Sequence, residues 1–201
     1  TEITRCSEGG VRGTTTYQLS LIIINGDVRN VYAIFGDTIH HDDQMIIPSA
    51  YQVKNAFRSN IAGVPYDVLS LSPNSRYDSW LTIGITDGDP DNQLGTIGIT
   101  DGDPDNQLGT IGINFDLWDL NGPLIVDNGA VFTMNPDYNM NGLTEVIIGQ
   151  LTIPSTISTE AIVTVQGKLK YSENTWKQSS VFSINPPIKN REYIPEGCTL
   201  W

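Results

Sequence analysis

Cysteine is nearly absent from this chain of 201 residues, which carries only Cys6 and Cys198. Two cysteines at opposite ends cannot supply the three or four ligands of a structural zinc or iron–sulfur site. They suit one disulfide that ties the two terminal segments together, within one chain or between two chains. We therefore expect a Cys6–Cys198 bridge, with two unpaired thiols as the alternative.

Positive charge is also scarce, because 11 Lys and Arg stand against 23 Asp and Glu, giving a net charge of −12. Like charge over most of the surface opposes binding to nucleic acid and to anionic membranes. The longest apolar run, LSLIII at 19–24, is far shorter than the ~20 residues that span a bilayer. We expect no nucleic-acid partner and no membrane insertion.

No leader with a charged start and an apolar centre precedes Thr1. A processed product is therefore expected, located outside the cell or at its surface after removal of a targeting peptide, with an algal organelle as the alternative.

No recognisable catalytic set is present either. The two histidines are adjacent, no serine stands in a nucleophile elbow, and no Gly-rich phosphate loop leads into a helix. The cluster His40, His41, Asp42 and Asp43 favours a solvated loop over a metal site, because neighbouring residues of an extended chain point in opposite directions. We expect no enzyme; a hydrolase that uses unrecognised paired carboxylates ranks third among the hypotheses.

The residues that are plentiful are those of strands and turns: Thr, Ile, Val, Asn, Asp and Gly. Short β-like runs follow one another with Gly, Pro, Asn and Asp between them. They lie at 14–24, 30–35, 66–72, 79–85, 130–134, 145–153, 161–171 and 180–184, with a further TIGI segment inside the repeat. This pattern predicts an all-β protein with a single antiparallel β-sandwich, of the jelly-roll or immunoglobulin-like kind.

Two stretches give more detailed expectations. In AIVTVQGKLKY at 161–171, alternation places Val163 and Val165 on a packed face and Ile162 and Thr164 on the opposite, wetter face. The stretch 49–61 is the one passable helical pattern, and we expect at most a turn or two there.

The chain divides into three parts by its patterns. Residues 1–13 read as an N-terminal arm, 14–184 as the sandwich domain with a projecting repeat at 82–109, and 185–201 as an extended C-terminal tail. The tail has apolar side chains that need a surface to cover them, and these are Ile188, Tyr193, Ile194, Leu200 and Trp201.

The repeat consists of TIGITDGDPDNQLG, present twice at 82–109 and followed by a partial copy, TIGIN. Its carboxylates alternate as in calcium loops, and they are Asp87, Asp89, Asp91, Asp101, Asp103 and Asp105. The sixth and twelfth positions, Asn92 and Gly98, lack the residues of an EF-hand, so an acidic hairpin loop is favoured over calcium binding. We expect no cofactor, with calcium as the alternative.

Strand parity gives a second expectation for the repeat. If the flanking strands follow one another in one sheet, an added strand-plus-turn unit would invert every later strand. The extra copy is therefore expected to project from the sheet, at a subunit contact or as a mobile flap, and its deletion should leave a folded protein.

Aromatic residues offer a further alternative function. Trp80, Trp118, Trp176 and Trp201, with Tyr66, Tyr77, Tyr138 and Tyr193, would suit a sugar-binding face. Core and interface roles are favoured for most of them, because large aromatic side chains are usually anchors.

Several segments together resemble a recurring β-domain of secreted or organelle-targeted proteins of algae and some bacteria. They are NVYAIFGD at 30–37, PSAYQ at 48–52, YDSWLTIGITDGD at 77–89, TIGINFDLW at 110–118 and AVFTMNPD at 130–137. The resemblance spans about residues 15–184 and implies no catalytic residues. Through it the chain resembles shell or surface-fibre subunits of algae. The additional fourteen-residue unit departs from that pattern.

The features combine into one leading hypothesis: a structural subunit that forms a fibre or sheet from copies of itself, through its tail and exposed strand edges. The alternative is a calcium-assisted adhesion or carbohydrate-binding module with glycans as partners.

Overall fold

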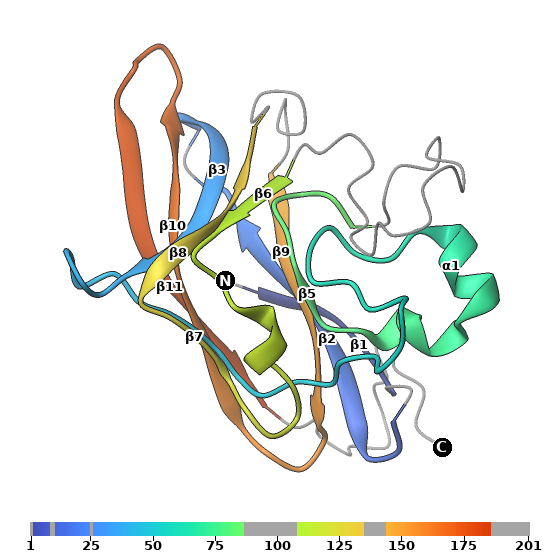
Figure 1. Ribbon diagram of the computed structural model, residues 1–201. Helices are drawn as coiled ribbons and strands as arrows, with labels where there is room; N and C mark the ends of the chain where they lie inside the picture. Colours follow the sequence, from blue (N-terminus) through green and yellow to red (C-terminus); the bar gives the residue numbers. More distant parts are fainter. Residues whose placement is uncertain (1, 9–10, 25, 87–107, 135–143, 186–201) are drawn as a thin grey trace.

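The computed structural model describes residues 2–8, 11–24, 26–86, 108–134 and 144–185, and only the backbone of 2–8. Two antiparallel sheets face each other across a common core (Figure 1). The predicted all-β sandwich is confirmed. Within the described residues, no helix is both long and apolar enough to cross a membrane.

The smaller sheet has four strands in the order β1-β2-β9-β5. Their bounds are β1 Glu2–Glu8, β2 Thr14–Ile22, β9 Glu145–Pro154 and β5 Trp80–Leu81. Strands β2 and β9 form its centre, with Thr14 opposite Pro154 and Ile22 opposite Glu145. The backbone of β1 pairs with β2, so part of the segment predicted to be an arm is an edge strand.

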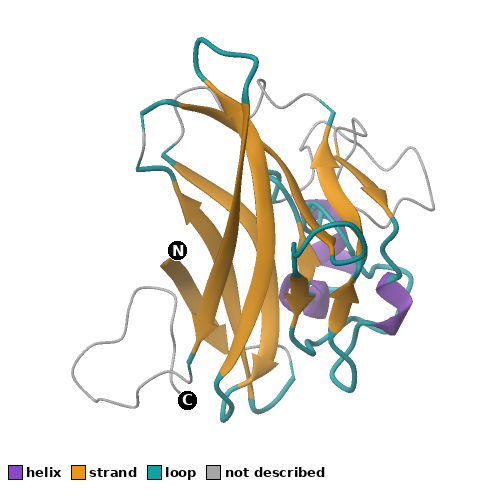
Figure 2. Ribbon diagram, turned by 90° about the vertical axis from the view of Figure 1, so that its left-hand side faces the viewer, coloured by secondary structure: helices purple, strands orange, loops and turns teal. Residues whose placement is uncertain are grey.

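The larger sheet has seven strands in the order β6-β8-β3-β10-β4-β7, with β11 paired to β10. Their bounds are β3 Val28–Asp37, β4 Met45–Ile47, β6 Leu108–Ile111, β7 Leu124–Val126, β8 Asn128–Thr133, β10 Thr159–Leu169 and β11 Thr175–Ile184. The hairpin β10–β11 pairs ten residues on each side, and Figure 2 shows these long strands from the side of the larger sheet. The packed face predicted for β10 is confirmed, since Val163 and Val165 are buried. On the face predicted to be wetter, however, Thr164 is buried as well, and its Oγ1 donates to the Gln44 carbonyl at 3.3 Å.

Strands β3 and β4 form one interrupted row along β10. Phe35 pairs with Thr164 and Ile46 with Ile162, so the chain leaves the row after Asp37 and returns before Met45. On their other side β8 and β7 form a matching row, in which β8 pairs with β3 and β7 with β4. Residues 38–44 are therefore an excursion between two segments that pair with the same neighbouring strands. From Phe35 to Ile46 the partner moves by two residues on β10, from Thr164 to Ile162, and by five residues on the other side, from Ala130 of β8 to Ile125 of β7.

The core contains the inner faces of both sheets and one large aromatic residue from a loop. Trp118 follows the 3-10 helix η2 (Phe115–Leu117) and is fully buried, and its Nε1 donates to the carbonyl of Pro48 at 2.9 Å. Because this hydrogen bond satisfies the indole N–H, the ring can pack in the core without an unpaired donor.

One expectation on local structure is wrong. Residues 66–72, predicted as a strand, form the helix α1 (Tyr66–Leu71), which is followed by the 3-10 helix η1 (Pro73–Tyr77). Residues 49–61, where at most a turn or two was expected, form no helix and contain a hydrogen-bonded turn in which the N–H of Arg58 donates to the Asn55 carbonyl at 3.3 Å. In that segment the N–H groups of Val53 and Ser59 donate to the carboxylate of Asp78, so a distant side chain takes donors that a helix would use.

The repeat joins strands of different sheets. Thr82 and Gly84, from its first copy, donate backbone hydrogen bonds to Ile148 and Ile147 and so extend β5 along β9 in the smaller sheet. Its end supplies β6, which pairs with β8 in the larger sheet. Strand parity therefore does not constrain the repeat as expected, because β5 and β6 belong to different sheets and not to one. An added unit lengthens the connection between the sheets and inverts neither strand. Residues 87–107 lie outside the described part of the chain.

Candidate functional sites

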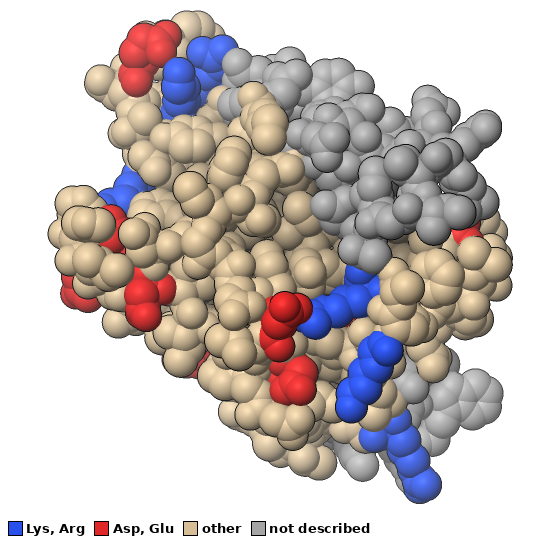
Figure 3. All heavy atoms as spheres, in the orientation of Figure 1, with Lys and Arg blue, Asp and Glu red and all other residues tan. Residues whose placement is uncertain are grey.

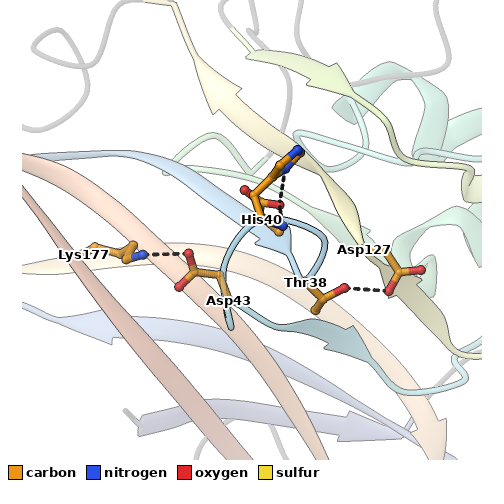
Figure 4. A network of polar contacts seen from close by, with 6 residues as sticks. Thr38, His40, Asp43, Asp127 and Lys177 are labelled. Carbon is orange, nitrogen blue, oxygen red and sulfur yellow. Dashed lines mark hydrogen bonds and ion pairs between the residues drawn. The ribbon is translucent and has the colours of Figure 1, made fainter.

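The excursion at 38–44 brings polar side chains together on the larger sheet (Figure 4). Thr38 Oγ1 donates to Asp127 Oδ1 at 3.1 Å, and the N–H of Thr38 donates to the Asp127 carbonyl at 2.8 Å. These two bonds fix the start of the excursion to the residue between β7 and β8. At its other end, the Asp43 carbonyl accepts the N–H of Asp37 at 2.8 Å. The excursion is thus a closed, hydrogen-bonded loop.

The predicted cluster His40, His41, Asp42 and Asp43 does not converge. His40 Nδ1 lies 2.9 Å from Asp37 Oδ1, whereas Asp43 Oδ2 accepts from Lys177 Nζ at 2.7 Å. In the described part of the chain, no group of three or more His, Cys, Asp or Glu side chains is placed to hold a metal ion. The favoured reading of a solvated loop also needs one correction, because Asp43 is buried at 8% exposure.

Asp37 organises the first turn of this loop. Its Oδ1 accepts the N–H of His40 at 3.0 Å in addition to the ring contact. Desolvation acts to raise the pKa of Asp37, but the hydrogen bonds from His40 and the charges of His40 and His41 outweigh it and lower the pKa. The pair is an Asp–His contact in which both partners shape the loop.

A second polar centre lies inside the molecule, at Asp78. Its carboxylate accepts three backbone N–H groups: Val53 at 2.8 Å, Ser59 at 2.6 Å and Ser79 at 3.2 Å. Burial raises the pKa of Asp78 to about 7, while the hydrogen bonds from Val53 and Ser59, the charge of Arg58 and the hydrogen bond from Ser79 act in the opposite direction.

The neighbours of Asp78 extend the network into the surrounding loops. Gln52 Nε2 donates to the Ser79 carbonyl at 3.0 Å, and its Oε1 accepts from Arg58 Nε at 3.1 Å. Ser79 Oγ accepts the N–H of Thr152 from β9 at 3.0 Å. These bonds join the segment 52–59 to the smaller sheet, so the arrangement holds the fold together rather than presenting an acid or base to a substrate. Sequence patterns could not single out Asp78 among 23 acidic residues.

The aromatic side chains in the described part of the chain do not gather on one sugar-binding face. Trp80 and Trp118 are buried at 3% and 0% exposure, as favoured from the sequence, and Trp176 is half-buried against the core. Tyr66 on α1 is exposed, and Trp201, Tyr138 and Tyr193 lie outside the described residues.

Several predicted site residues are not described. They are the six repeat carboxylates Asp87, Asp89, Asp91, Asp101, Asp103 and Asp105, the cysteine Cys198, and the tail residues Ile188, Tyr193, Ile194, Leu200 and Trp201. Cys6 lies in β1, of which only the backbone is described. Calcium binding, the disulfide and the tail contact therefore stay predictions.

An apolar row crosses the outer face of the larger sheet. Ile162 of β10 lies directly opposite Val181 of β11 on one side and Ile46 of β4 on the other, and Ile46 lies opposite Ile125 of β7. We call Val181, Ile162, Ile46 and Ile125 the outer apolar row. Its two ends are exposed, Val181 by 44% and Ile125 by 60%. Sequence analysis missed this row, because it depends on pairing between strands far apart in the chain.

Charged side chains leave much of the surface uncovered. In the face drawn in Figure 3, Asp, Glu, Lys and Arg stand in separate small groups with uncharged surface between them. The described residues on this face form no continuous basic patch of the kind that tracks a phosphate backbone.

Comparison with known proteins adds no relative: no family model, no curated protein and no solved structure matches this chain.

Proposed function

We propose that the chain is a structural, non-enzymatic subunit that assembles with copies of itself into an extracellular fibre or protein sheet. The observation that carries the proposal is the outer apolar row, which places four aliphatic side chains side by side on a face that points away from the core. The solvent side of an antiparallel sheet is ordinarily polar. A row of this kind is typical of a surface that another protein covers.

A second copy of the chain is the partner that fits the row. The row is aliphatic and runs across four paired strands, with its two ends exposed and its two inner members half-buried, and the same row on another copy has the same chemistry. Two copies related by a two-fold axis can therefore bury one row against the other. Each aliphatic side chain that is withdrawn from water contributes on the order of 1 kcal/mol.

The neighbouring residues extend the apolar surface. Phe35, next to the row on β3, lies opposite Ala130 of β8, and Ala130 lies opposite Ile111 of β6, which is 66% exposed. Strand β6 is the last strand on this side of the sheet order. An apolar face that reaches an end strand supports association through both the face and the edge of the sheet.

Variants at the row test the proposal. Ile125→Asp places a charge on the exposed end of the row without touching the core, so the assemblies should become narrower and the sedimentable fraction should fall several-fold. Thr175→Asp is the matched control, because Thr175 is an exposed polar position on the outer face of β11. The measurements are sedimentation velocity and negative-stain electron microscopy.

Two results would contradict the proposal: a wild-type chain that stays monomeric at high concentration, or an equal loss of assembly in both variants. The calcium-assisted or carbohydrate-binding module is the alternative hypothesis, and calorimetry with calcium and with a panel of glycans tests it. Nothing among the described residues favours it over the subunit.

A further inference from the structure

A cavity of about 290 Å³ opens at one end of the sandwich, between the end of β2 and the inner face of the larger sheet. Polar and apolar atoms contribute about equally to its wall. Ile23 and Ile24 line it from the segment after β2, Val165 and Leu169 from β10, and Trp176 and Gln178 from β11. The longest apolar run of the sequence thus continues beyond β2 and supplies one wall of the cavity.

The cavity suits apolar side chains carried on a peptide. Ile24 at its edge is 93% exposed, although it is aliphatic. Trp176 Nε1 donates to the Lys168 carbonyl at 3.2 Å, so the indole N–H is satisfied and the ring can present carbon to a ligand. Gln178 and Ser180 are polar residues on the inward-facing side of β11, and they can accept and donate hydrogen bonds to a peptide backbone.

The described chain ends at the opposite end of the sandwich. Asn185 follows β11, and its carbonyl accepts a hydrogen bond from Tyr17 Oη at 3.1 Å between the two sheets. Trp176 at the cavity and Asn185 are nine residues apart along an extended strand, a separation of roughly 30 Å. In Figure 1, β11 runs from the β10–β11 turn at the top towards the lower end of the molecule. The segment 186–201 therefore starts far from the cavity.

We propose that the cavity receives the apolar side chains of segment 186–201 from a second copy of the chain. The inference rests on the proposed function and names the acceptor site for the tail. Because the donor segment and the acceptor cavity lie at opposite ends, the contact is head-to-tail and repeats along a line. The outer apolar row remains available for contacts between neighbouring filaments of head-to-tail copies.

A neighbour's segment fits the cavity better than the chain's own segment. To reach its own cavity, segment 186–201 would have to run back along the sandwich, using more than half of its sixteen residues to cover the distance. Ordering those residues costs conformational entropy without placing an apolar side chain in the cavity. A segment from a copy aligned end to end enters the cavity directly.

Two variants of the full chain test the acceptor cavity and the donor segment separately. Both also carry Ile125→Asp, which suppresses face-to-face association. The acceptor variant is Gln178→Trp, which fills the cavity from an exposed position, and its control is Ser179→Trp, at the next residue on the opposite face of β11. The donor variant replaces Ile188, Tyr193, Ile194, Leu200 and Trp201 with Ser. Circular dichroism and thermal melts verify that each chain is folded, and sedimentation velocity gives its mass.

The expected result is that the acceptor and donor variants are each monomeric, while the Ser179→Trp control keeps the head-to-tail oligomers. Mixing the two variants should give a particle of twice the monomer mass, because one intact tail meets one intact cavity. If the Gln178→Trp chain still forms oligomers, or if the mixture stays monomeric, the inference about the cavity is wrong while the proposed function stands. A wild-type chain that never assembles would overturn the proposed function as well.

Discussion

At the scale of single residues, Asp78 shows how one carboxylate can replace regular secondary structure. Two of the three N–H groups that it accepts belong to a segment 19 to 25 residues earlier in the chain. These bonds hold the irregular loop at 52–59 against β5 and β9. The loop stays in place because a buried acceptor satisfies donors that would otherwise have no partner.

Asp78→Ala should lower the free energy of unfolding by about 3 kcal/mol, because it leaves buried N–H donors without an acceptor and removes packed atoms. Urea denaturation followed by tryptophan fluorescence measures the effect. Asp116→Ala is the matched control, since Asp116 lies exposed on η2 and should change stability by less than about 0.5 kcal/mol. Equal effects of the two substitutions would contradict this role of Asp78.

The same residue predicts a pH dependence. Its folded pKa of about 7 lies above the value of ~3.9 for an unfolded chain, so between these values the folded state binds more protons. Its contribution to stability is therefore fully present below about pH 4 and declines as the pH rises to 7. Asp78→Asn, which cannot ionise, should flatten this part of the curve. A wild-type stability that rises from pH 4 to pH 7 in parallel with the variant would contradict the prediction.

Sequence patterns could predict some of these residues and not others. The size and apolar character of Trp80 and Trp118 favoured the core, and both are buried. Asp78 and Asp43 look like any other acid in the sequence, because their burial depends on partners such as Val53 and Lys177 that are 25 and 134 residues away. Local spacing carries no information about such partners.

At the scale of elements, local alternation predicted the long strands well. It placed β10 and its packed face correctly, because each residue of a strand points to the side opposite to its neighbour's, but it did not predict that Thr164 on the other face is buried. It could not predict that β10 pairs with β3, β4 and β11, which decides that Ile162 stands between Ile46 and Val181. The helix α1 was missed for a related reason: its residues lie outside both sheets, so no neighbouring strand holds them extended.

Removal of fourteen residues from the repeat should leave the fold intact. Deletion of any fourteen consecutive residues between 82 and 113 gives the same shortened sequence. The deletion is therefore equivalent to removing fourteen residues from within 87–107, which keeps β5 and β6. Shortening this connection threefold lowers the loop-closure entropy cost by ~1 kcal/mol, so stability should be unchanged or slightly higher.

A thermal melt of the deletion variant checks this expectation. Deletion of residues 108–121 is the control of equal length, because it removes β6 and the buried Trp118 and should abolish cooperative unfolding. Loss of folding in the repeat deletion would show that the second copy is part of the sandwich.

At the scale of the whole molecule, charge and apolar surface act against each other. Copies with a net charge of −12 repel one another, whereas the outer apolar row favours association. The row is uncharged, so screening by salt weakens the repulsion without weakening the attraction.

Assembly should therefore become more favourable as salt concentration rises. Between about 20 and 300 mM sodium chloride, the protein concentration at which light scattering begins should fall several-fold. Ile125→Asp adds a charge at the contact and should shift the onset to higher protein concentration at every salt level. A higher onset concentration at high salt would indicate that ion pairs, and not apolar surface, hold the copies together.

The position of the repeat between the two sheets has a consequence at the level of the gene. Here β5 and β6 belong to different sheets, so a gene with one, two or three units encodes the same paired strands. The number of copies thus sets the length of the connection between β5 and β6, and selection can vary this inherited length in steps of fourteen residues without changing the sandwich.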